Sequence, residues 1–122
     1  MADTPEAILD EFEAAMTNGD DEAMVALYED DALMVVQEFG IVARGRAAIR
    51  ETFRNMKSMG EGLGFSVTSH PISVVGDYAF GHLLGEVRVK TPEDEEVAYV
   101  MDSREVFHRG PDGVWRYLAD IG

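Results

Sequence analysis

Asp120 is the residue of this chain best suited by its surroundings to transfer a proton. It stands two residues from the end of the sequence, within the apolar and aromatic run 115–121. A carboxyl group buried beside apolar groups has a raised pKa and can act as a general base. Strand alternation places Asp120 on one face with Arg116 and Leu118, and Tyr117 on the other. The alternative is a carboxylate at a frayed chain end in water.

Three further polar residues lie on neighbouring predicted strands and could orient a substrate or donate a proton. Asp102 and Arg104 are two residues apart, so they share a strand face and can bracket a polar group. His82 shares its face with Phe80 and Leu84, which suits a proton-transfer group beside an apolar ligand. The structural alternatives are a cross-strand ion pair for the first two and a hydrogen-bonded core or rim histidine for the third.

Apolar side chains on the predicted helices and strands could line a pocket for a hydrophobic ligand. The chain has seven methionines, and the flexible methionine side chain adapts to irregular ligands. An ordinary core in which methionines fill gaps explains the same pattern, so both interpretations stay open. The predicted lining residues are Phe12, Met16, Tyr28, Met34, Val36, Phe53, Met101 and Leu118.

Motifs that hold metals or cofactors are missing from the sequence. There is no cysteine, which excludes a thiolate metal site and a cysteine nucleophile. His70, His82 and His108 do not have the spacing of metal ligands. Neither a glycine-rich phosphate loop nor a Gly-x-Ser-x-Gly motif occurs. We therefore expect neither a metal nor a cofactor.

The length and charge of the chain limit its partners. Its 122 residues suit a single domain over 1–122, and its formal net charge is −14. Such a surface repels nucleic acid and anionic membranes. No apolar run approaches the roughly 20 residues of a membrane span, and the acidic start resembles no targeting peptide. We expect a cytoplasmic protein without nucleic-acid or membrane partners.

Periodic apolar residues predict three helices in the first half of the chain. The first covers residues 4–17, with Thr4 as its N-cap. Asp20 caps a short second helix, whose inner face is predicted to carry Tyr28. The third helix covers residues 46–58 and has one apolar face.

The remaining segments predict β-strands. A continuous apolar run favours a strand at 32–36, and residues 39–43 form either a short strand or a loop. Gly81 and Gly85 share a strand face, which indicates sheet bending or a close backbone approach. A helical half followed by an antiparallel half is typical of the α+β class. The longer predicted strands cover residues 64–75, 78–90, 96–109 and 114–121.

Several motifs are distributed over nearly the whole chain: Asn18-Gly19-Asp20, residues 26–32, residues 44–50, Arg104, residues 107–109 and residues 112–116. Together they resemble the nuclear transport factor 2-like superfamily, and most closely its SnoaL-like and ketosteroid isomerase-like members. The resemblance implies a cystatin-like fold: a cone-shaped, curved antiparallel sheet wrapped around three N-terminal helices. It also implies a deep pocket and a homodimer through the outer sheet face. The superfamily includes isomerases, cyclases, hydrolases and proteins without catalysis.

The polar residues of ketosteroid isomerases are missing at the matching positions. Their oxyanion-hole tyrosine corresponds to Phe12, their catalytic base to Val36, and their second acid falls at or near Ser103. We therefore do not expect the ketosteroid isomerase mechanism in this chain.

One functional residue of limonene epoxide hydrolase-like proteins is matched. Asp120 corresponds to their water-activating aspartate on the last strand. The positions of their tyrosine and asparagine hold Met34 and Val36, and no arginine–aspartate pair is found near residues 83–86. Asp120 is therefore a candidate base without the partners that the family supplies.

Two hypotheses about function follow. The first is a small-molecule enzyme with an apolar pocket that performs cofactor-free acid/base chemistry, namely isomerisation, cyclisation or hydrolysis, on a hydrophobic substrate. Asp120 would be the base, with Asp102, Arg104 or His82 orienting the substrate or donating a proton. The second is a non-catalytic module of the same fold that binds a hydrophobic ligand or dimerises.

Overall fold

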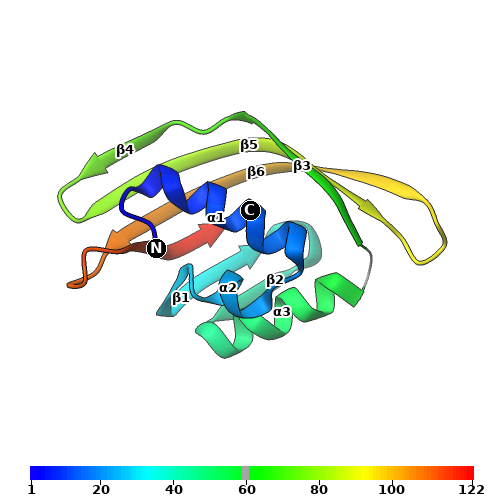
Figure 1. Cartoon of the computed structure of the whole chain (residues 1–122), viewed down its shortest axis with the longest axis horizontal. Coiled ribbons are helices and arrows are strands. Elements are labelled where there is room, and N and C mark those ends of the chain that lie inside the picture. Colours follow the sequence, from blue (N-terminus) through cyan, green and yellow to red (C-terminus); the bar gives the residue numbers. More distant parts are fainter. Residues whose placement is uncertain (59–60) are drawn as a thin grey trace.

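The computed structural model of the protein describes residues 1–58 and 61–122. Its helices lie on the concave side of a strongly curved sheet (Figure 1), which confirms the predicted α+β class. The helices are α1 (Pro5–Asn18), α2 (Asp21–Val25) and α3 (Arg46–Ser58), with a 3-10 turn, η1, at Gln37–Phe39. The strands are β1 (Tyr28–Val36), β2 (Ile41–Arg44), β3 (Glu61–Ser69), β4 (Ile72–Val75), β5 (Tyr78–Lys90), β6 (Glu96–Arg109) and β7 (Trp115–Ile121).

Local sequence signals account for the ends of α1 and α2. The hydroxyl oxygen of Thr4 accepts a hydrogen bond from the backbone N–H of Ala7, and Gly19 ends α1 with a left-handed φ of 61°. The carboxylate of Asp20 accepts from the N–H of Ala23 and caps α2. Tyr28 was expected on this second helix, but it is the first residue of β1.

The seven strands form one sheet in which the last strand lies in the middle. The order is β2-β1-β7-β6-β5-β3, and β4 pairs with β5. All pairs are antiparallel except β1 and β7, which run parallel and make the sheet mixed. A short hairpin can join only antiparallel strands, whereas parallel strands need a longer connection. The chain between β1 and β7 is long, so these two strands can pair in parallel.

The structure corrects the prediction for one segment and decides between two predicted alternatives for another. The predicted strand 64–75 is two strands, β3 and β4, separated at His70 and Pro71. Proline has no N–H to donate and restricts the residue before it, so it interrupts the ladder. The sequence is compatible with either a short strand or a loop at residues 39–43, and in the structure Ile41–Arg44 is the short strand β2.

The core lies between the helices and the inner face of the sheet. Aromatic rings dominate its centre, where Tyr28 stacks on Tyr117 with ring centroids 4.8 Å apart. Phe107 contacts the other side of this stack, 5.0 Å from Tyr117, and Phe12 reaches it from α1 at 6.3 Å. The rings of four elements therefore pack together at this point, which fixes β1, β6, β7 and α1 relative to one another.

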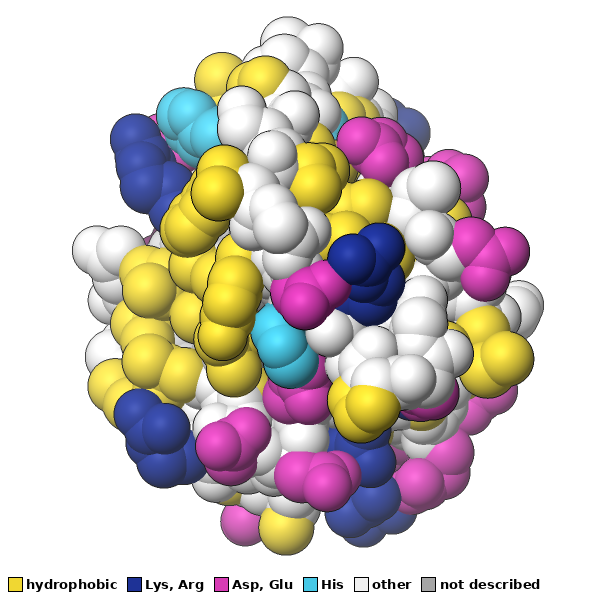
Figure 2. All heavy atoms as spheres, turned by 90° about the vertical axis from the view of Figure 1, so that its left-hand side faces the viewer, with side chains coloured by type: hydrophobic (Ala, Val, Ile, Leu, Met, Phe, Trp, Pro, Cys, Tyr) yellow, Lys and Arg dark blue, Asp and Glu magenta, His cyan; other side chains and the backbone are white. Residues whose placement is uncertain are grey.

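Apolar side chains are also exposed on the sheet. Val75, Tyr78, Phe80 and Val100 are between 45% and 79% exposed. Figure 2 looks at the end of the molecule where β4 turns into β5 and shows hydrophobic side chains gathered on one side of it, next to charged and histidine side chains. The outer face of the sheet is therefore partly apolar.

Gly85 lies where two backbones approach closely, as its position in the sequence indicated. A Cβ atom added there would lie 2.5 Å from the carbonyl oxygen of Ser66 on β3. We expect Gly85→Ala to lower the free energy of unfolding by about 2–3 kcal/mol, because overpacking at a backbone is not relieved by a rotamer change. Urea denaturation measures the effect.

Gly64 on β3 provides the matched control. Its added Cβ would meet only the Arg88 guanidinium, at 3.5 Å, which is an ordinary contact. Gly64→Ala should therefore be neutral or slightly stabilising. Equal stability of the two variants would contradict the close approach at Gly85.

Candidate functional site

Asp120 is held firmly at the centre of the sheet. It lies opposite Met34 on β1 and opposite Glu105 on β6. The chain end beyond it is also tied down, because the N–H of Gly122 donates to the carbonyl of Val35 at 2.8 Å. The alternative of a frayed C-terminus in water is therefore wrong.

A β-bulge decides which way Asp120 points. Phe107 pairs with Tyr117, whereas the preceding residue Val106 pairs with Ala119, so Leu118 is an extra residue on β7. Simple alternation placed Tyr117 and Asp120 on opposite faces. The extra residue reverses the alternation, and both side chains face the helices.

Tyr28 donates a hydrogen bond to Asp120. Its hydroxyl lies 2.7 Å from Oδ2 of the carboxyl group. Burial, the strongest influence, raises the pKa of Asp120 to about 7; the bond from Tyr28 opposes this rise, and the charge of Glu105 contributes to it. Burial and the nearby Asp120 also raise the pKa of Tyr28 well above its usual range, so Tyr28 stays a neutral donor.

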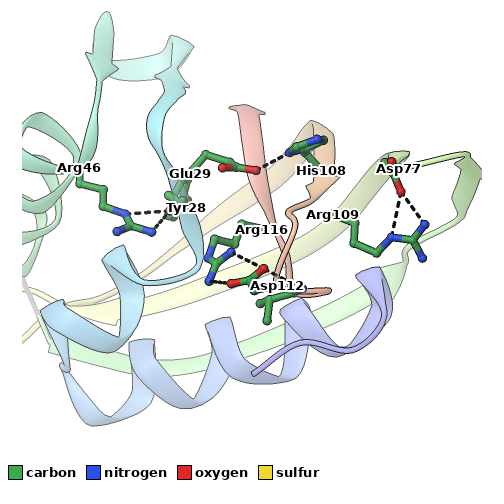
Figure 3. A network of polar contacts seen from close by, with 9 residues as sticks. Tyr28, Glu29, Arg46, Asp77, His108, Arg109, Asp112 and Arg116 are labelled. Atoms are coloured by element: carbon green, nitrogen blue, oxygen red, sulfur yellow. Dashed lines mark hydrogen bonds and ion pairs between the residues drawn. The ribbon is translucent and has the colours of Figure 1, made fainter.

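Arg46 fixes the position of Tyr28 from the first turn of α3. Its Nε and Nη2 atoms donate to the Tyr28 carbonyl oxygen at 2.9 and 2.7 Å, and its Nη1 pairs with Asp30 at 2.9 Å. Figure 3 shows the guanidinium group reaching this carbonyl where β1 begins. The planar fork of arginine suits such a two-point contact. Arg46 thereby anchors the residue that binds Asp120.

Asp120 lines a cavity of about 280 Å³ between the helices and the sheet. Six of the eight predicted pocket residues line it as well: Phe12, Met16, Met34, Val36, Phe53 and Met101. The other two are not among the lining residues. Tyr28 is fully buried and reaches the site through its hydroxyl group, and Leu118 lies half-buried at the bulge.

A family assignment rests on nearly the whole chain. The family described as the SnoaL-like domain matches residues 9–117. The protein belongs to the SnoaL-like family. No curated protein matches the sequence.

Solved structures share the fold of this SnoaL-like protein at low sequence identity. A Mycobacterium tuberculosis protein of unknown function is 21% identical, with a TM-score of 0.82 over 95% of this chain and 66% of its own. A dehydratase candidate of the NTF2-like family from Streptomyces avermitilis is 20% identical, with a TM-score of 0.82 and coverages of 95% and 90%. A ketosteroid isomerase-like protein from Erwinia carotovora atroseptica is 15% identical, with a TM-score of 0.81 and coverages of 95% and 89%. They confirm the predicted NTF2-like fold.

The SnoaL-like chain brings the other three predicted catalytic residues together, but not with Asp120. Nε2 of His82 lies 2.7 Å from Oδ1 of Asp102, and Nη1 of Arg104 lies 3.1 Å from the same oxygen. His82 pairs across the ladder with Arg104 on the outer face, whereas Glu105 and Asp120 pair on the inner face. The strand pleat therefore directs the side chains of this exposed cluster to the face opposite Asp120. Asp102 is the one member of the cluster that is also among the described residues lining the cavity.

Two buried polar residues near Asp120 were missed from the sequence. Nε2 of His70 lies 2.5 Å from Oε1 of Glu105, and both side chains are buried. In the sequence His70 precedes Pro71, which favours a structural role and gives no signal of this contact. One signal was available for Glu105: it shares a strand face with Met101 and Phe107, where a solvated glutamate is not expected.

The described part of the chain has neither a cluster of metal ligands nor a membrane-spanning helix. Among residues 1–58 and 61–122, no three histidine, aspartate or glutamate side chains are grouped so that they could hold a metal ion. Over the same residues, none of the helices is both long and apolar enough to span a bilayer.

Proposed function

We propose that this SnoaL-like protein binds a small, neutral, apolar molecule in its cavity and moves a proton on it through Asp120. The observation that carries the proposal is a carboxyl group with a pKa of about 7 that faces an apolar cavity. At neutral pH such a group exists in both forms, so it can accept a proton and return it.

The geometry favours isomerisation of a carbon acid. Tyr28 occupies Oδ2 of Asp120, while Oδ1 has no hydrogen-bond partner among the described residues. Oδ1 takes a proton from a carbon next to a carbonyl group, and the electron pair of the C–H bond stays on the ligand as an enolate. The protonated carboxyl then returns the proton to the α-carbon or, where a conjugated double bond of the ligand extends the enolate to a dienolate, to its γ-carbon. These two proton transfers need neither water nor a co-reactant.

Ser103 is our candidate for stabilising the enolate. It lines the cavity and lies on the inner face of β6, two residues from Glu105. Its hydroxyl group can donate a hydrogen bond to a developing oxyanion. The resemblance places the second acid of ketosteroid isomerases at or near this position, so a neutral donor would take over its role.

The charges around the cavity support a ligand without negative charge. Lys57 is the single cation among the described lining residues, and its Nζ is held by Asp21 and by the Gly19 carbonyl, each at 3.0 Å. Asp20 and Glu38 also line the cavity and are exposed. An anion entering this cavity would therefore meet carboxylates without a free cation to offset them.

The cavity volume limits the size of the ligand. At about 280 Å³ it lies just below the range of roughly 300–1,000 Å³ that is typical of ligand pockets. A compound with one or two rings fits such a space better than a steroid with four.

Proton exchange on a bicyclic ketone tests this proposal. We expect the protein to accelerate exchange of the α-protons of 2-tetralone in D₂O, measured by proton NMR. Asp120→Asn should reduce the rate by at least 10²-fold, because the base is lost, while binding persists. In thermal-shift measurements 2-tetralone should raise the melting temperature, whereas tetrahydro-2-naphthoate, an anion with the same ring skeleton, should not.

The same experiment addresses the non-catalytic alternative. The apolar residues Phe12 and Val36, at positions where related enzymes have polar groups, favour simple ligand binding. A ligand that stabilises the wild-type protein without faster exchange would support binding alone. Exchange that continues unchanged in Asp120→Asn would overturn the assigned base.

We also propose a homodimer through the outer sheet face, as the resemblance implies. The exposed side chains of Tyr78, Phe80 and Val100 support an apolar contact there. Light scattering coupled to gel filtration should give twice the mass of the chain, and Phe80→Asp should give the mass of one chain.

A further inference from the structure

His70 and Glu105 form a buried polar pair that packing alone does not require. Only 9% of the His70 side chain and 1% of the Glu105 side chain are exposed. The atoms Nε2 and Oε1 lie 2.5 Å apart. Burying such a pair costs solvation free energy. Burying two apolar residues of similar size would not carry this cost. Strongly perturbed buried groups also cluster at functional sites.

Gly81 on β5 provides the space for this pair. An added Cβ atom would lie 2.8 Å from Oε1 of Glu105 and 3.3 Å from Nε2 of His70, and also 3.1 Å from Cε2 of Phe107. Any larger residue at this position would displace the carboxyl group. Gly81 on β5 and His70 in the β3–β4 junction therefore both contribute to the position of the Glu105 side chain.

Glu105 stands directly opposite Asp120 across the β6–β7 ladder. Side chains at opposite positions on one sheet face have Cβ atoms about 4.5–5.5 Å apart. Glu105 is not among the residues that line the cavity, whereas Asp120 is. Glu105 can therefore act on a ligand only through Asp120.

We propose that Glu105 is a positioning residue that, held by His70, presents a negative charge to Asp120 and opposes its ionisation. The role in catalysis rests on the proposed function, but the interaction between the two carboxyl groups does not. A nearby like charge makes it harder to remove a proton from a carboxyl group. Glu105 would thus keep Asp120 able to gain and lose a proton near neutral pH.

Several other titratable groups face these two carboxyls. Tyr28 donates to Asp120 from β1, and His70 contacts Glu105 from the junction of β3 and β4. Burial raises the pKa of Glu105, while hydrogen bonds from His70 and Tyr117 oppose the rise. These donors favour the ionised form of Glu105, which the proposal requires.

An NMR titration tests the proposal without any substrate. We expect Glu105→Gln to lower the pKa of Asp120 by about one unit, observed through its carboxyl ¹³C signal, since a unit charge is removed nearby. Glu86→Gln is the matched control, because Glu86 is exposed on the outer face of β5. It should leave the Asp120 titration within about 0.2 units of that of the wild-type protein, since solvent screens its charge.

The wild-type protein gives a second readout if Glu105→Gln does not fold. Its Glu105 carboxyl carbon should have the chemical shift of an ionised group at pH 7. A protonated Glu105 at this pH, or an unchanged Asp120 titration in a folded Glu105→Gln variant, would overturn the proposal. Absence of proton exchange on a ketone, with the shift of the Asp120 titration still present, would overturn only the proposed function.

Discussion

Asp120→Asn should stabilise the protein at pH 8 by about 2–4 kcal/mol relative to the wild-type chain. Burial raises the pKa of this carboxyl from 3.8 to about 7, so the folded state disfavours its charge. Each unit of pKa shift corresponds to about 1.4 kcal/mol, which sets an upper bound of about 4 kcal/mol. Asparagine can still accept the hydrogen bond of Tyr28 through its amide oxygen.

The direction in which stability changes with pH follows from the number of protons that the folded and unfolded chains bind. Between pH 4 and 7 the folded chain holds a proton on Asp120 that the unfolded chain has lost, so wild-type stability falls as pH rises through this window. Below pH 4 both states are protonated, and Asp120 no longer contributes a difference. The two proteins should therefore be close in stability at pH 4 and diverge up to pH 7.

Urea denaturation at a series of pH values measures this divergence. Asp112→Asn is the control, and its effect on stability should have the opposite sign. Arg116 lowers the pKa of Asp112, so the charge of Asp112 is favourable in the folded state. A constant difference between wild-type and Asp120→Asn from pH 4 to 8 would show that Asp120 is not a desolvated acid. The prediction also means that the site is kept at a cost in stability, as is common for active sites.

Phe107→Ala should destabilise the protein by about 3–5 kcal/mol, the usual range for a phenylalanine removed from a core. Phe107 is 0% exposed and packs against Tyr117, with ring centroids 5.0 Å apart, and against His70 at 6.5 Å. Its loss would leave a cavity beneath the aromatic stack that carries Tyr28. The free energy of unfolding in urea measures this loss.

Phe80→Ala is the matched control on the neighbouring strand. Phe80 is 51% exposed on the outer face, so its loss should cost less than about 1 kcal/mol in the monomer. Both variants should be measured over a tenfold range of protein concentration, because dimerisation through the outer face would make the Phe80 effect concentration-dependent. Equal costs for the two variants at every concentration would contradict the assignment of inner and outer faces.

Features with short-range causes were predictable from the sequence. Thr4 and Asp20 cap their helices because their side chains accept hydrogen bonds from N–H groups three residues away. The long strand over 96–109 and the helix over 46–58 follow from periodicity and have the predicted bounds. Asp120 was predictable as a candidate base because it is the single acid in an otherwise largely apolar strand.

Only the tertiary structure decided what surrounds Asp120. The extra residue Leu118 is accommodated by the pairing of β7 with β6, and nothing in the local sequence marks where a strand gains such a residue. The bond from Tyr28 joins residues 92 positions apart. The pairing of His70 with Glu105 spans 35 positions and needs the space left by Gly81. The sequence by itself determined that Asp120 is the residue best suited to transfer a proton. Long-range strand pairing decided which of them face one another, because a shift of one residue reverses every side chain that follows.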